Sequence, residues 1–175
     1  MSERSYRTLE ALSGPLYFLA LLLICTPLVD ILANIWPLNF GDVAWRYGAV
    51  GMFSGFVLTP LLGVALACWI AVSLGHYLLQ RVLGWLSLIS AVVLFVAAAG
   101  FSLDVVQLRH TVPTNPPQAM WTFEIGAAKA LLKHVTAALS LVWFAVAMRR
   151  ALRDAQGVIH RPAAPLVARP ADPES

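Results

Sequence analysis

The chain has 175 residues, of which 59% are hydrophobic and 12% are charged, and its formal net charge at pH 7 is +3. Soluble domains carry about 25% charged residues, so the composition excludes an ordinary water-soluble domain. It predicts a protein whose main partner is the lipid bilayer, and we expect no nucleic-acid partner.

Four long apolar runs follow one another along the chain, at residues 12–36, 47–74, 82–103 and 123–148. Each run reaches the roughly 20 residues that a helix needs to span a bilayer core of ~30 Å. They predict an all-α membrane protein in which residues 1–154 form a four-helix, up-down transmembrane bundle. Residues 155–175 contain four prolines and no apolar period, which is typical of a disordered tail.

Positive charges gather on one side of the predicted bundle, before the first run, between the second and third, and after the fourth. These residues are Arg4, Arg7, Arg81, Arg149, Arg150, Arg153, Arg161 and Arg169. Only Arg46 and Arg109 fall in the loops of the opposite side. The positive-inside rule then predicts a multi-pass protein of the cell membrane, of bacterial inner-membrane type, with both termini and the tail in the cytoplasm. The first run is longer than a signal-peptide core of about 7–15 residues, which favours an uncleaved anchor.

The second run carries small residues at every fourth position. They are Gly51, Gly55, Thr59, Gly63, Ala67, Ala71 and Gly75. Such a stripe lets a neighbouring helix approach closely in lipid. We favour packing inside this bundle, with residues 97–100 of the third run as the receiving surface. The alternative is self-association, or contact with another subunit, through the Gly51, Gly55 and Gly63 face. Pro60 lies near the middle of the run and favours a bend.

Two lysines, Lys129 and Lys133, lie one helical turn apart inside the fourth run. A lysine in hydrocarbon costs roughly 2.5–3.5 kcal/mol, so both require a partner or a polar cavity. Their face of the helix also carries Thr122, Gly126, Thr136 and Ser140. On the first run, Asp30 shares a face with Asn34 and lies at a depth similar to that of Lys129. We therefore expect Asp30 and Lys129 to form an ion pair.

Further charges lie where the runs meet the outer loops. Arg46 begins the second run, Asp104 ends the third, and Glu124 begins the fourth. Together with Asp30 and the two lysines they supply three charges of each sign. We expect a charge-balanced polar network or cavity at the outer mouth of the bundle.

The sequence lacks the residues that several kinds of enzyme and cofactor site require. Cys25 and Cys68 do not form a C-x-x-C pair, which disulfide-generating membrane oxidoreductases resembling vitamin K epoxide reductase need. The four histidines do not pair across two runs at one depth, so we expect no haem. We also expect no metal site and no other cofactor, since phosphate-loop, nucleophile-elbow and dinucleotide motifs are absent.

Two functions remain open. The first is a non-enzymatic accessory, anchor or assembly subunit of a membrane complex, which the glycine stripe and the lack of catalytic motifs favour. The alternative is a small transporter, channel or membrane enzyme that uses an outer-half cavity formed by Asp30, Lys129 and Lys133. No motif ties the sequence to a characterised family, and its plan is similar to that of many small four-helix bacterial membrane proteins.

Overall fold

The computed structural model describes residues 3–112 and 117–159, and within these ranges it contains five α-helices and no strand. The helices are α1 (Glu3–Ile35), α2 (Val43–Phe56), α3 (Leu58–Ser73), α4 (Tyr77–Arg109) and α5 (Pro117–Ile159). The predicted all-helical fold is confirmed over this part of the chain.

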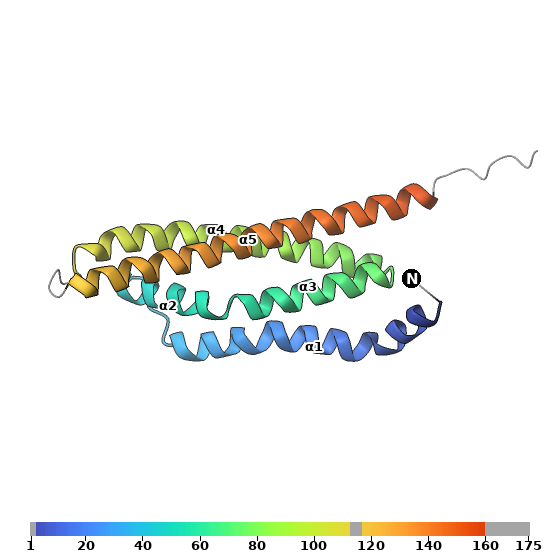
Figure 1. Ribbon diagram of the computed structural model, residues 1–175, viewed down its shortest axis with the longest axis horizontal. Coiled ribbons are helices and arrows are strands. Elements are labelled where there is room, and N and C mark those ends of the chain that lie inside the picture. Colours follow the sequence, from blue (N-terminus) through green and yellow to red (C-terminus); the bar gives the residue numbers. More distant parts are fainter. Residues whose placement is uncertain (1–2, 113–116, 160–175) are drawn as a thin grey trace, which may run out of the picture.

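The helices form an elongated bundle in which α4 and α5 lie side by side (Figure 1). In the described residues, Cα atoms of α1 come within 8 Å of α2 and α3 but not of α4 or α5. The N-terminal end of α1 and the C-terminal end of α5 lie at the same end of the bundle (Figure 1). The α2 and α3 helices therefore join α1 to the α4–α5 pair, and one side of α1 is left without a neighbour.

Three helices are long and apolar enough to cross a membrane: α1, α4 and α5. The pair of α2 and α3 passes the same test as a single element that is bent by 47°, which would make a fourth span. Helices α1, α4 and α5 extend well beyond the predicted apolar runs into polar flanking residues.

The bend between α2 and α3 follows from Pro60. A proline inside a helix has no N–H for the carbonyl four residues earlier, and its ring pushes that carbonyl away. Here that carbonyl belongs to Phe56, the last residue of α2, and the break falls at Val57. The Val57 carbonyl still accepts the N–H of Leu61 at 3.3 Å, so the chain resumes as a helix at once. The bend predicted from Pro60 is confirmed.

Two boundaries predicted from the sequence differ from the structure. The predicted runs leave residues 75–81 as the connection between the second and third spans, but Tyr77 already begins α4. Gly75, with φ of 67°, makes the turn in a backbone conformation that favours glycine. At the C-terminus α5 continues to Ile159, past the predicted domain boundary at 154. The remainder of the predicted disordered tail, residues 160–175, lies outside the described residues.

The small-residue stripe divides at the bend. A Cβ atom built at Gly63 would lie only 2.7 Å from the Ala20 carbonyl oxygen, so Gly63 packs directly against α1. A Cβ at Gly51 or Gly55 would meet nothing within 4 Å. The expectation that residues 97–100 receive the stripe is therefore wrong at Gly63, because α1 occupies that position.

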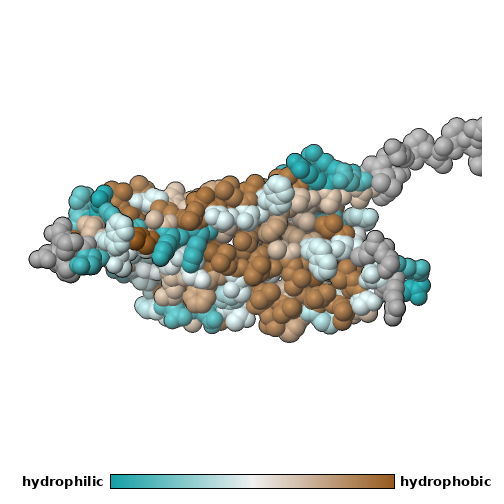
Figure 2. Space-filling model, in the orientation of Figure 1, coloured by the Kyte–Doolittle hydropathy of each residue, from teal (hydrophilic) through white to brown (hydrophobic). Residues whose placement is uncertain are grey.

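The surface of the bundle is largely apolar. Figure 2 shows wide apolar areas along the body, with hydrophilic residues at both ends of the bundle and in patches on the half away from the N-terminal end of α1. Large apolar side chains such as Leu62, Val96 and Trp143 are exposed, whereas the interior contains many alanines, among them Ala71, Ala91 and Ala138. Small residues inside and large apolar residues outside are typical of helices that pack in lipid.

Candidate functional site

Arg46 and Asp104 form a two-pronged ion pair between α2 and α4. The Arg46 Nη2 lies 2.7 Å from Asp104 Oδ1, and Nε lies 3.1 Å from Oδ2. The Asp104 residue is only 4% exposed, while the Arg46 side chain is 33% exposed. The pair lies at what we call the outer end of the bundle, following the predicted orientation. This end contains the C-terminal ends of α1 and α4 and the N-terminal end of α2.

The N-terminal end of α2 holds Arg46 in place. Asp42 caps the helix, since its Oδ1 accepts the N–H of Ala44 at 2.8 Å. The Trp45 Nε1 donates to the carbonyl of Ile35 at 3.1 Å, which ties α2 to the end of α1. The Arg46 Nη1 donates to the carbonyl of Phe40 at 2.7 Å. Arg46 thus links the loop between α1 and α2 to α4.

The predicted outer network divides into separate ion pairs. Glu124 of α5 pairs with Arg109 at 2.9 Å, and both of these side chains are largely exposed. Neither lysine takes part in an ion pair within the residues that the structure describes, and nor does Asp30. The expected single network of six charges is therefore wrong. Of those six charges, only Arg46 and Asp104 pair with each other.

The lysine face of α5 consists of Lys129, Lys133, Thr136 and Ser140. Its residues share one side of the helix as predicted, but that side is turned outward, with both lysines exposed. The hydroxyls of Thr136 and Ser140 donate to carbonyls of α5 itself. The opposite side of α5 packs into the bundle through small and apolar residues, including Ala127, Ala130, Ala137, Ala138 and Leu141.

Asp30 does not reach Lys129. Asp30 and Asn34 are exposed on α1, and the Asn34 side chain donates to the Asp30 backbone carbonyl at 2.7 Å. In the described residues no Cα atom of α1 lies within 8 Å of one in α5, because α2 and α3 join α1 to the rest of the bundle. The predicted ion pair is wrong. The cavities described below are not lined by Asp30, Lys129 or Lys133.

A cavity of about 520 Å³ opens beside the Arg46–Asp104 pair instead. Apolar side chains of α1, α2 and α4 form most of its wall, and Arg46, Asp104, Gln107 and His134 are its polar residues. This volume lies within the roughly 300–1,000 Å³ that is usual for ligand pockets.

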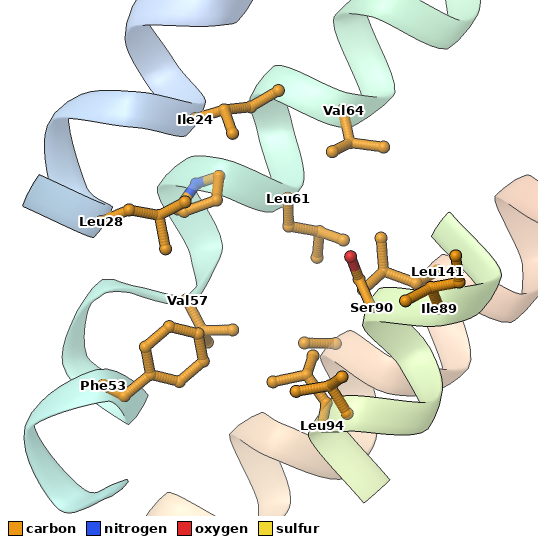
Figure 3. A pocket seen from close by; sticks show the side chains of 13 residues that line it. Ile24, Leu28, Phe53, Val57, Leu61, Val64, Ile89, Ser90, Leu94 and Leu141 are labelled. Carbon is orange, nitrogen blue, oxygen red and sulfur yellow. The ribbon is translucent and has the colours of Figure 1, made fainter. Parts of the chain in front are cut away.

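A second cavity of about 370 Å³ adjoins the first, because Phe53, Val93 and Leu94 line both. Figure 3 shows Ile24 and Leu28 of α1 on one side of it and Leu94 of α4 on the other. The two cavities therefore join into one groove between α1 and α4, and exposed wall residues such as Leu28 of α1 and Val93 of α4 mark its open side. We call it the α1–α4 groove.

His134 of α5 lies at the wall of the groove and is 1% exposed. Its Nδ1 lies 2.8 Å from the Ala130 carbonyl oxygen, which can only accept, so Nδ1 carries the proton. In the neutral ring Nε2 is then an acceptor, and it is buried without a hydrogen-bond partner among the described residues. His134 is not among the site residues predicted from the sequence. Its position on the alanine-rich side of α5 was the available signal that it faces the interior.

Metal ligation has no candidate in the described residues, which contain no group of three or more His, Cys, Asp or Glu side chains able to hold an ion. Cys68 is buried and Cys25 is exposed, each with a free thiol. No family model, no curated protein and no solved structure matches this chain.

Proposed function

We propose that the chain is a four-span protein of the cell membrane and serves as an accessory or assembly subunit of a larger membrane complex, with no catalytic role. The outward lysine face of α5 supports this proposal most strongly. Its natural partner is a membrane-spanning segment of another protein with a carboxylate at matching depth.

The depth of the lysines provides the physical argument. At a rise of ~1.5 Å per residue, Lys133 lies about 18 Å along α5 from Trp121 and about 24 Å from Arg149. Both reference residues suit the two membrane surfaces, so Lys133 would lie near the middle of the bilayer. An unpaired lysine there costs roughly 2.5–3.5 kcal/mol, and a carboxylate of a neighbouring helix would offset that cost.

Replacing Lys129 and Lys133 together with methionine should release the chain from its complex. We expect the share that migrates as a larger assembly in gentle detergent to fall at least tenfold, which corresponds to about 1.4 kcal/mol. Native gel electrophoresis of the full-length chain from its own membranes gives this measurement. Arg150→Met is the matched control, since it removes an exposed cation of α5 outside the apolar segment.

Photo-crosslinking identifies the partner. A benzophenone amino acid at Thr136, beside Lys133, should attach to a membrane-spanning segment that contains an aspartate or glutamate. The same probe at Val92, an exposed position on α4, should not attach to that segment. A monomeric wild-type chain, or a double variant that keeps its assembly, would contradict the proposal.

A further inference from the structure

We propose that the α1–α4 groove binds a neutral lipid with a hydroxyl-bearing head and a long hydrocarbon tail, a chemistry shared by isoprenoid quinols and long-chain alcohols. The head would lie between His134 and the Arg46–Asp104 pair, and the tail would run along the groove toward Val64. This inference does not depend on the assembly role of the lysine face.

The buried, unpartnered Nε2 of His134 favours a ligand that carries a hydroxyl group. A buried acceptor without a donor costs about 1–3 kcal/mol. The Nε2 has no partner in the described residues, while Nδ1 is already used by the Ala130 carbonyl. Because Nε2 has almost no accessible surface, a wall side chain such as Phe53, whose ring centroid lies 5.6 Å from that of His134, would shift to admit the ligand. A ligand O–H would then satisfy Nε2 of the neutral ring, whereas a carbonyl group or an ester oxygen alone could not.

The Arg46–Asp104 ion pair favours a ligand whose head group is uncharged. Asp104 matches the charge of Arg46, so the polar part of the groove has no excess positive charge with which to hold a phosphate. A guanidinium carries five N–H groups, and the bonds to Asp104 and to the Phe40 carbonyl leave at least one of them free. Arg46 could therefore donate to a ligand oxygen, while His134 accepts from the ligand.

The remaining length of the groove suits a hydrocarbon tail. In the second cavity all lining side chains except Ser90 are apolar (Figure 3). Leu28, Val93 and Leu103 line the groove and are exposed on either side of the gap between α1 and α4. In a bilayer this gap would face lipid, so a lipid could enter sideways without crossing the polar surface.

Binding to the purified full-length chain in detergent tests the proposal. The probes are ubiquinol-2 kept under reducing conditions, the long-chain alcohol geranylgeraniol, and phosphatidylglycerol as an anionic comparison. Isothermal titration and native mass spectrometry should detect the quinol, the alcohol or both, with phosphatidylglycerol at least tenfold weaker. Binding of both neutral probes would indicate recognition of the hydroxyl alone, and binding of ubiquinol-2 only would indicate that the ring is also required.

Two variants locate the site. His134→Phe keeps a ring but removes the acceptor, and it should weaken the neutral probes at least tenfold. Val93→Trp fills the junction of the two cavities from an exposed position (59% exposed), so it should abolish binding and leave the fold intact. Val96→Trp is the matched control, because Val96 lies on the same helix, is 67% exposed and lines neither cavity.

Three outcomes would overturn the proposal: no binding of either neutral probe, tighter binding of phosphatidylglycerol, or equal affinities of the Val93→Trp and Val96→Trp variants. Loss of assembly in the lysine variants with lipid binding unchanged would leave it standing, so the two functions can fail separately.

Discussion

Arg46→Met is expected to lower the free energy of unfolding by about 1–3 kcal/mol, the usual cost of leaving a buried acceptor, here Asp104, without its donor. Asp104 is 4% exposed and receives its side-chain hydrogen bonds from Arg46. Without the guanidinium, its carboxylate would be buried unpaired among apolar side chains. The variant also loses the bond from Arg46 to the Phe40 carbonyl, so the loop before α2 should loosen as well. Denaturant titration in detergent, followed by circular dichroism, measures the change.

The other ion pair of the outer end provides the matched control. Arg109 and Glu124 are 2.9 Å apart, but their side chains are 62% and 43% exposed. Exposed pairs contribute about 0–1 kcal/mol, so Arg109→Met should have little effect. The double variant Arg46→Met with Asp104→Leu should recover much of the lost stability, because no buried charge remains. Equal losses for Arg46→Met and Arg109→Met would contradict this account of the site.

The apolar runs were sufficient to predict helices, since each run is long enough to cross a bilayer core as a helix. The bend was also predictable, because Pro60 acts on the local backbone through a missing N–H. These features depend on residues that are close together in the sequence. Membrane insertion and the four-span topology stay predictions that rest on the apolarity and length of the helices.

Which helices pack against each other could not be predicted from the depth of their residues along the bundle. Asp30 and Lys129 were paired because they lie at similar distances from the outer end, but depth is only one coordinate of a helical bundle. The contact between Gly63 and Ala20 brings α1 against α3, which leaves α1 away from α5. The direction in which each helix turns its faces depends on these close packings, and a single sequence does not specify them.

The lysine face illustrates the same limit. Helical periodicity correctly placed Lys129, Lys133 and Thr136 on one side of α5, yet it could not tell whether that side faces the interior. The opposite side holds Ala127, Ala130, Ala137 and Ala138, and small residues are the ones that allow close helix contact. A comparison of the two sides would have predicted the outward lysines, and with them the inward His134.

Gly63→Ala should destabilise the bundle by about 1–3 kcal/mol, as is usual when an atom is forced into a filled space. The added Cβ would lie 2.7 Å from the Ala20 carbonyl oxygen and 2.8 Å from Ile24 Cγ1. A backbone oxygen cannot rotate away, so α1 as a whole must move from α3. Beyond α3, the described part of α1 is held mainly by the bond from Trp45 to the Ile35 carbonyl and by the hydrogen bond between Tyr17 and His76.

Gly55→Ala separates this steric effect from helix propensity. A Cβ at Gly55 meets nothing within 4 Å, so the substitution should be neutral or stabilise α2 by up to about 1 kcal/mol. Cys68 can report the difference, since it is buried beside Ala20 in the interior cluster. In a Cys25→Ser background, a maleimide dye that fluoresces on reaction should label Cys68 at a lower temperature in Gly63→Ala than in Gly55→Ala. Labelling of both variants at one temperature would mean that the contact between α1 and α3 is looser than the Gly63 geometry requires.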